Sequence, residues 1–568
     1  MALADTTNCP QRETTPIPSS SIPQKRALLE EDHSPAISSP LNPDVASKST
    51  TQKVQFQTPE ETVTNTMTRE KRTKKDSLKK RESKGLAPFE SSRSTQAANK
   101  APKESLADMA PLRYKLAPPK PTDFDLARGP IFTSHHETTD PSGNQIEFFE
   151  TSDHVYNKKS FHYTHCIADP TFPSMFYYRR TDPEPYGAHM SFEDAASHVY
   201  FTKSGTHVTT DKGFRMSRAN VAVREGKWYW ECKVTRGIPK DSSGGSNGHV
   251  RIGFARREAS LDAPVGFDAY SYGLRDASGQ KVHMSRPKDF FPTDESICEG
   301  DVIGLEINLP SERLHRKIVS GQYNPAVDVE DSAPNPRDIE YPNIIRDRIP
   351  IRFKAHIYFE KIDYQTTKEL EELMNPSPVG TGSAGANATA TPPNPLHPVP
   401  GLRTLPRSYI KVYKNGKLMG TPWTDLLAFL PPASKMGSGT TQGNRDALDD
   451  GEVGYYPAVS VFRGGAVEVN FGEDGWWFPP ESLTEEGSDV EMGGTEENGR
   501  RPVAERYNEQ IVEDTVYDII DEVGFWAIGV GKDRIGGKVL AGEKVMIGGG
   551  TGRGGDNDEE IKELVQDD

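Results

Sequence analysis

Residues 213–234 read GFRMSRANVAVREGKWYWECKV, and the second half of this stretch decides the fold. From residue 228 onward, apolar side chains alternate with more polar ones. The apolar set is Trp228, Trp230, Cys232 and Val234, and the set between them is Tyr229, Glu231 and Lys233. A period of two is typical of a β-strand with one buried face. The stretch therefore predicts a strand that packs the first set inward and turns the second set outward.

Further strands with this period follow along the chain. In GHVRIGFARR, Val250, Ile252 and Phe254 alternate with Arg251, which puts the arginine on the opposite face. Strands are also predicted at 302–309, at 456–462 and 466–472, and as one unbroken strand over 351–360. Asn415-Gly416 is a strong hairpin signal. Short strands without long helices between them predict an antiparallel sandwich of two sheets with long loop insertions.

An aromatic and Pro-rich segment, APVGFDAYSYGLRD, lies between two of these strands. It brings Pro264, Phe267, Tyr270 and Tyr272 close to Arg275 in sequence. Exposed aromatic residues beside arginines are typical of the centre of a protein interface. The segment is therefore a candidate partner-binding surface.

These blocks, together with IPIRFKAHIYFE, SYIKVYKNG and YYPAVSVFRGGAVEVNFG, resemble the SPRY domain of the Ash-two/Bre-two family over about half of the chain. The resemblance implies a mainly β fold with an SPRY-type sandwich. It also implies a non-catalytic scaffold subunit of the COMPASS (Set-one) complex, which methylates lysine four of histone H3 in the nucleus. The fungal branch is indicated, because only Cys9 and Cys166 lie where animal members carry a zinc-bearing region.

Residues and partners follow from the same resemblance. The family's surface for an acidic segment of its WD-repeat scaffold subunit, of the retinoblastoma-binding type, maps onto Phe214, Arg251, Pro264, Phe267 and Arg275. Better-known members have tyrosine at the positions of Phe214 and Phe267, so two hydroxyl donors are missing here. The resemblance also implies a dumpy-thirty-like dimer and a SET-domain methyltransferase as partners, with nucleosomal DNA as a further candidate.

A C-terminal helix is predicted over 505–526, with Gly524 as its stop. Its apolar residues recur at helical spacing and are Val512, Val516, Ile519, Ile520 and Val523. A short amphipathic helix between flexible segments is marginal alone and needs a groove. The dumpy-thirty-like dimer supplies that groove by resemblance, and the alternative is that the helix packs back on the SPRY domain.

The amino-acid composition argues against several other classes of protein. Only 34% of the 568 residues are hydrophobic and the net charge is −15, so much of the chain is expected to be unfolded and the whole is not expected to coat DNA. Four distant cysteines offer neither a disulfide framework nor a zinc pair. No run is long and apolar enough for a membrane span, and no secretory signal design is present.

The predicted organisation is as follows. Residues 1–125 are disordered, 126–480 form the sandwich with insertions near 311–345, 374–404 and 431–453, 481–504 are an acidic linker, and 527–568 are a flexible Gly-rich acidic tail. A basic cluster at 69–84 suits nuclear import or DNA contact, or is a solvated charge run. Its members are Lys71, Arg72, Lys74, Lys75, Lys79, Lys80 and Arg81.

No catalytic constellation, cofactor fingerprint or metal set is predicted. His154, His162, His165 and Cys166 lie near one another in sequence, but zinc usually takes a second ligand pair at matching spacing, so an aromatic-rich surface loop is the preferred reading. The glycines in the tail do not form a phosphate-binding motif. The alternative function is an SPRY adaptor that recruits substrates to a ubiquitin ligase, although the cysteines of a RING or B-box are absent.

Overall fold

The computed structural model describes residues 119–158, 160–169, 178–240, 248–328, 349–375, 391–436, 449–479 and 500–536, with side chains up to residue 520. The basic cluster at 69–84, the acidic stretch 481–499 and residues 537–568 lie outside this part of the chain. Ordered structure begins before the predicted boundary at residue 126. The short helix η3 (Pro121–Phe124) holds Asp123, which accepts a hydrogen bond from Arg352 at 2.7 Å.

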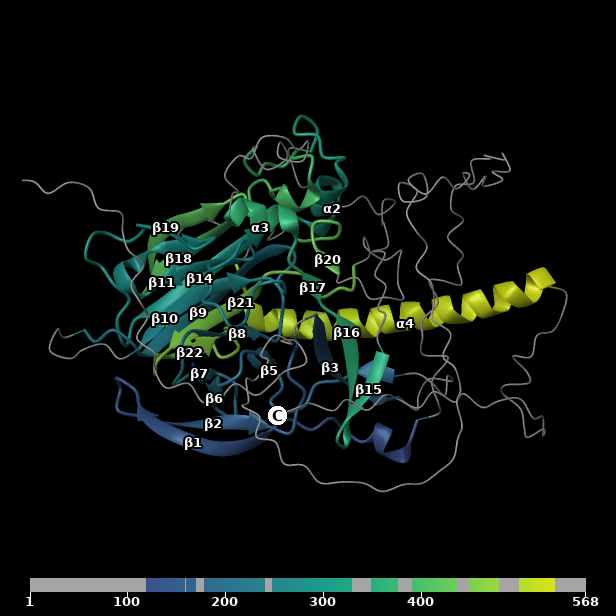
Figure 1. Cartoon of the computed structure of the whole chain (residues 1–568), viewed down its shortest axis with the longest axis horizontal. Helices are drawn as coiled ribbons and strands as arrows, with labels where there is room; N and C mark the ends of the chain where they lie inside the picture. The colour runs from purple at the N-terminus through teal and green to yellow at the C-terminus, as the bar shows by residue number, and fades with distance from the viewer. Residues whose placement is uncertain are drawn as a thin grey trace, which may run out of the picture. The chain divides into compact units, whose positions relative to one another are not determined.

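Two antiparallel sheets form the predicted sandwich (Figure 1). The larger sheet has at its centre β9 (Gly226–Arg236), which contains the tryptophans of the opening stretch. Its order is β1 (Ile131–Thr139), β2 (Gln145–Ser152), β6 (Tyr200–Phe201), β7 (His207–Thr209), β22 (Ala466–Asn470), β9, β14 (Val302–Leu309), β18 (Tyr409–Lys414) and β19 (Lys417–Thr424), and β23 (Arg501–Pro502) pairs with β9 in parallel. Asn415 and Gly416 join β18 to β19 with positive φ angles of 51° and 81°, which confirms the predicted hairpin.

The second sheet carries both arginines of the candidate surface. Its order is β13 (Arg286–Lys288), β12 (Lys281–His283), β11 (Ser271–Arg275), β10 (His249–Ala255), β21 (Tyr456–Phe462), β8 (Arg215–Ala219) and β5 (Met190–Ala195). The short helix η4 (Ala277–Gly279) follows β11. Because β10 and β11 are neighbours, residues distant in sequence meet on one face of this sheet.

A smaller sheet corrects two predictions. It consists of β15 (Ile349–Phe353), β16 (His356–Ile362), β3 (Phe161–Ala168) and β4 (Tyr178–Arg180). The single strand predicted over 351–360 is a hairpin, because Lys354 adopts a φ of 52° and turns the chain; the alternation continues through the turn and hides it. His162, His165 and Cys166 lie on β3 and are buried, so the surface-loop reading was wrong. β17 (Tyr364–Gln365) pairs with β20 (Lys435–Met436) beside this sheet.

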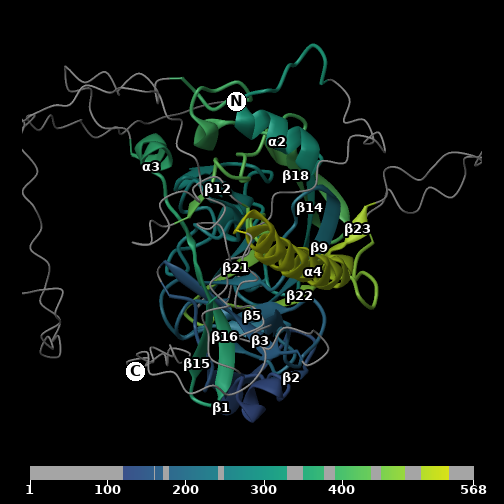
Figure 2. The same ribbon diagram turned by 90° about the vertical axis from the view of Figure 1, so that its right-hand side faces the viewer.

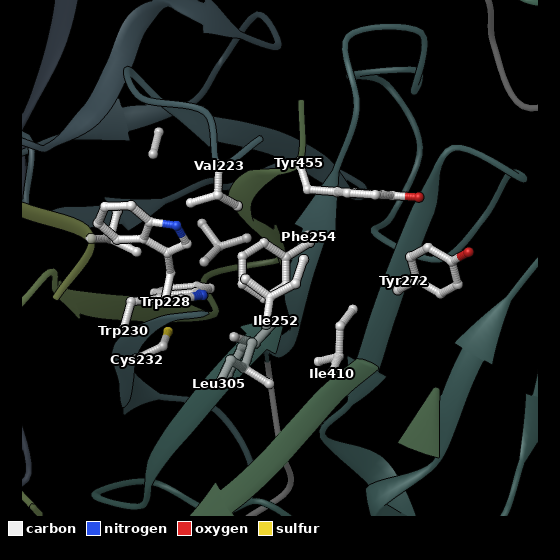
Figure 3. Packing of buried hydrophobic residues seen from close by; sticks show 14 of the residues in the cluster. Val223, Trp228, Trp230, Cys232, Ile252, Phe254, Tyr272, Leu305, Ile410 and Tyr455 are labelled. Atoms are coloured by element: carbon white, nitrogen blue, oxygen red, sulfur yellow. The ribbon is translucent and has the colours of Figure 1, made fainter. Parts of the chain in front are cut away.

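The main core lies between the two large sheets (Figure 3). Trp228, Trp230 and Cys232 of β9 face Ile252 and Phe254 of β10, and all five side chains are almost completely buried. The Trp230 and Phe254 rings meet edge to face with centroids 6.1 Å apart. The apolar alternation therefore predicted the inward-facing side chains of both strands.

Two of the three side chains predicted to point outward from β9 are also buried, contrary to the prediction. Tyr229 and Glu231 are covered by the chain after β22. Glu231 accepts hydrogen bonds from the backbone N–H groups of Trp477 and Phe478 at 2.7 and 3.1 Å, and the Trp476 ring packs edge to face on Tyr229. A strand periodicity identifies the face that is apolar, but it does not show which polar groups a later segment covers.

Helices occupy the edges of the sandwich. The predicted insertion at 311–345 begins with α2 (Glu312–Ser320), which Ser311 caps and which buries Leu314, Ile318 and Val319. α3 (Lys368–Met374) ends where the second predicted insertion begins, and the short helix η5 (Pro400–Leu402) lies inside that insertion. α4 (Val503–Gly536) continues through Gly524, so this glycine does not end the helix. No described helix has both the length and the apolar content to cross a membrane.

Candidate partner-binding surfaces

Arg251 and Arg275 lie directly opposite each other on β10 and β11. The Arg251 guanidinium stands 5.0 Å from the centre of the Phe214 ring, and one of its nitrogens donates to the Val265 carbonyl at 3.5 Å. Burial, together with the neighbouring positive charge of Arg275, lowers the pKa of Arg251 to about 10. The sheet thus holds two like charges side by side at an energetic cost.

Neither arginine forms an ion pair with a carboxylate of the described chain. Arg275 donates to the side-chain oxygen of Gln280 at 3.3 Å, and the Nε of Arg251 is buried without an acceptor in this structure. Asp276, which follows Arg275 in sequence, is already engaged, because it accepts from His249 at 2.9 Å and from the Val250 N–H at 3.0 Å. Two positive charges therefore remain available to an external anion.

The two phenylalanines predicted for this surface differ in their exposure. Phe267 is 45% exposed, while Phe214 packs on Phe462 with ring centroids 4.8 Å apart. Tyr270 and Tyr272 are buried, so the prediction that they belong to an exposed aromatic cluster was wrong. The structure brings Phe214, Arg251 and Arg275 together, and Arg251 also contacts the backbone of the loop that carries Pro264 and Phe267. The two tyrosines lie in the core.

Two residues that sequence reasoning missed fix the loop before β11. Asp268 accepts hydrogen bonds from the Ser271 hydroxyl at 2.8 Å and from the Tyr270 N–H at 3.0 Å. Ser460 of β21 accepts from the Val265 N–H at 2.6 Å. The loop also passes close to β12, because a Cβ on Gly266 would lie 2.5 Å from the Val282 carbonyl oxygen. Only the Asp-x-x-Ser spacing of residues 268–271 hinted at this turn.

The second candidate surface is the outer face of α4. This helix begins beside β9 and β23 (Figure 2) and Val503 and Tyr507 join the core. Its predicted apolar residues point away from the sandwich, with Val512 exposed by 62% and Val516, Ile519 and Ile520 by 43–48%. Ile511 is also exposed, and the side chain of Val523 lies outside the described part.

Polar residues occupy the buried side of the same helix. Asp514 and Asp518 are almost completely buried, and Arg506 donates to the Ala222 carbonyl oxygen at 3.0 Å. At 3.6 residues per turn, Val512, Val516 and Ile519 lie on the side opposite Asp514. α4 therefore turns its charged side to the domain and its apolar side to solvent. The helix packs on the SPRY domain as the second alternative expects, and docking of a partner on its apolar side stays a prediction.

The histidines of β3 take part in a buried charge network. His162 lies 2.8 Å from a Glu452 carboxylate oxygen, and His165 lies 3.1 Å from Glu193. His162, Asp450 and Glu452 are close enough to share a metal ion. Glu452 is already paired with the cations Lys361, Arg180 and Arg257, however, so positive protein groups occupy the position that a metal would take.

Comparisons with known proteins place the chain in a family. Residues 227–315 match the SPRY domain. The chain is 59% identical to "COMPASS component cclA" of Colletotrichum higginsianum over 575 residues, which span 97% of this chain and 96% of that protein. It is 38% identical over 430 residues to "Set1 complex component ash2" of Schizosaccharomyces pombe, a match that covers 75% of this chain and 54% of that protein. It is 26% identical over 490 residues to "COMPASS component BRE2" of Saccharomyces cerevisiae, a match that covers 69% of this chain and 92% of that protein. The chain therefore belongs to the Ash-two/Bre-two family of COMPASS components, in its fungal branch.

Proposed function

We propose that this protein is a non-catalytic scaffold subunit of a COMPASS complex in the nucleus, where it supports methylation of lysine four of histone H3. The fungal relatives that carry COMPASS or Set1 complex names support this role. They do not favour the ubiquitin-ligase adaptor. The observation that carries the proposal is the Arg251–Arg275 pair, two positive charges beside the Phe214 ring with no described carboxylate paired to them.

The arginine pair fits an acidic segment of the WD-repeat scaffold subunit. A carboxylate placed between Arg251 and Arg275 would remove their mutual repulsion and accept charge-assisted hydrogen bonds from both. The rings of Phe214 and Phe267 shield these bonds from water, which strengthens them. Since phenylalanine replaces tyrosine at both positions, recognition here depends on the guanidinium groups and on apolar contact.

The outer face of α4 fits the groove of a dumpy-thirty-like dimer. Val512, Val516 and Ile519 form an apolar stripe at helical spacing, which is the pattern of helices that lie in hydrophobic grooves. Their exposure in the isolated chain is costly in water and is relieved when a partner covers them. This surface is independent of the arginine pair, since it lies on a different element.

The scaffold acts by holding partners and contributes no reacting group. With the WD-repeat segment on one surface and the dimer on the other, it orders the SET-domain methyltransferase in its active arrangement. Nuclear import or DNA contact by the basic cluster at 69–84 remains a further prediction. Deleting residues 71–84 separates them, since a DNA contact gives salt-dependent binding that the deletion removes.

A reconstituted complex tests the arginine surface. Arg251→Ala combined with Arg275→Ala removes two charge-assisted contacts of about 1.5 kcal/mol each, so we expect about a 100-fold loss of affinity for the WD-repeat scaffold, and a matching loss of methylation at limiting scaffold concentration. Arg128→Ala combined with Lys417→Ala removes the same charge from exposed positions elsewhere and should change neither measurement. Unchanged assembly and methylation in the Arg251/Arg275 variant would overturn the assignment.

A further inference from the structure

The buried side of α4 is joined to the sandwich by charges. Arg180 of β4 lies 3.1 Å from the Asp514 carboxylate and 3.4 Å from Glu452. Although burial lowers the pKa of Arg180, the carboxylates of Asp514, Asp182 and Glu452 raise it above its ordinary value, so this arginine stays charged. It therefore connects the helix with the loop that precedes β21.

The connection extends deep into the domain. From Glu452, the network passes to Arg257 at 3.5 Å, from Arg257 to Asp194 at 3.7 Å, and from Asp194 to Arg218 at 2.7 Å. Arg218 then donates to the carbonyl oxygen of Ala259 at 3.0 Å, in the segment that leads into the arginine surface. Side chains of several strands thus share one set of buried contacts with α4.

A second set of contacts holds the first turns of α4. Arg506 makes two hydrogen bonds of 2.6 Å to Glu513, about two turns further along the helix, and its Nε donates to the Ala222 carbonyl oxygen. Val503 and Tyr507 of the same turns are buried in the main core. Together with Asp514, these contacts fasten the helix at successive turns.

Charged contacts fix a helix differently from apolar ones. An apolar side can rotate or slide by part of a turn with little loss, whereas an arginine–carboxylate pair loses its hydrogen bonds when the donor and acceptor move apart. Single buried polar residues specify register and orientation in helix pairs by this mechanism. The polar side of α4 is thus suited to set the direction in which the opposite, apolar side faces.

We propose that Arg180 and Asp514 are positioning residues that hold α4 and the SPRY domain as one rigid unit, and so fix the orientation of a dimer bound on the outer face of the helix. This inference rests on the proposed docking of that dimer. The pair touches no partner in this arrangement. It acts by keeping the dimer at a constant position relative to the arginine surface.

Spin-label distances test the orientation directly. Labels at Ser204→Cys on the sandwich and Thr515→Cys on α4, in a full-length chain with Cys9→Ser and Cys298→Ser, should give a narrow distance distribution. Asp514→Asn should broaden it, and Asp514→Glu should restore part of the narrow population. Glu505→Gln is the matched control, because Glu505 lies on the same helix and forms an exposed pair with Arg501 of β23. It should leave the distance distribution unchanged.

Activity in the reconstituted complex supplies the second measurement. At saturating dimer, Asp514→Asn should lower methylation at least threefold while dimer affinity stays within threefold of the original. Arg180→Lys, which keeps the charge but loses the planar fork, tests the pair if Asp514→Asn folds poorly. A narrow distribution with unchanged methylation in both variants would overturn the proposal. Dimer binding that survives charges placed at Val512 and Ile519 would instead overturn the docking itself.

Discussion

Gly253 lies at a close approach of two backbones in the SPRY sandwich. It lies on β10 opposite Gly273 of β11, and a Cβ at this position would lie 1.9 Å from the Tyr272 carbonyl oxygen. The strands that carry Arg251 and Arg275 can pair this closely only because the side chain is absent. The glycine therefore positions the arginine surface indirectly.

Gly253→Ala should lower the free energy of unfolding by at least about 2 kcal/mol, because the two strands must separate to admit the methyl group. Chemical denaturation of the full chain measures the change. Gly213→Ala is the matched control, since a Cβ there meets nothing within 4 Å. Equal stability of the two variants would contradict this account of the strand pairing.

The stability of the fold depends on pH in part through His283. Its ring stacks on Tyr272 with centroids 4.2 Å apart, and its Nδ1 lies 2.8 Å from the Ser271 carbonyl oxygen. Burial lowers the pKa of this ring from 6.5 to about 4. Between these values the unfolded chain binds a proton that the folded chain does not, so the stabilisation is complete above pH 6.5 and is lost as the pH falls toward 4.

Between pH 7 and pH 5, His283→Gln should therefore lose less stability than the original chain. The measurement is the denaturation midpoint at both pH values. His207, whose pKa burial also lowers to about 4, accounts for part of the acid sensitivity that remains. Parallel losses in the original chain and the variant would show that His283 does not contribute.

The helix α4 exposes apolar side chains to solvent and buries charged ones, the reverse of the usual amphipathic arrangement. Most helices on a domain surface bury their apolar side. Here Asp514 and Asp518 are buried, while Val512 and Ile519 face solvent. The sequence pattern alone predicts the apolar stripe but not its direction, because a stripe looks the same whether it faces the domain or a partner.

Val512→Asp combined with Ile519→Asp should abolish binding of the dumpy-thirty-like dimer, because two buried carboxylates without partners would be required in the groove. Calorimetry with the full chain measures the binding. The melting temperature should stay unchanged, since both positions are exposed. Asn508→Asp serves as the control, because this exposed position lies one turn before Val512 on the same side of the helix and adds a charge beyond the end of the apolar stripe.

The segment that leads into α4 ties three strands of the larger sheet together through Arg500. Arg500 donates to Glu306 of β14 at 2.6 Å and to the Tyr413 hydroxyl at 2.8 Å. Its guanidinium also lies over the Tyr229 ring at 5.5 Å. Residues separated by nearly the whole SPRY domain in sequence are thus held together by one arginine on the outer face of β9, β14 and β18.

Arg500→Ala should destabilise the fold by about 2–3 kcal/mol, since it removes the charged donor of a carboxylate that is 1% exposed. Arg501→Ala, at the next position, breaks pairs with Glu505 and Glu509 that are largely exposed and should cost at most about 1 kcal/mol. Thermal unfolding of both variants provides the comparison. The reverse order of stability would contradict the role assigned to Arg500.

Local sequence signals were enough to predict the inner faces of β9 and β10, the β18–β19 hairpin and the apolar stripe of α4. Each depends on the spacing of neighbouring residues, which the backbone geometry converts directly into a face or a turn. Only the tertiary structure decided that Tyr229 and Glu231 are covered, that His162 on β3 meets Glu452, and that α4 turns its charged side inward. These outcomes depend on contacts between segments far apart in the chain, and local periodicity carries no information about which distant charge will be the partner.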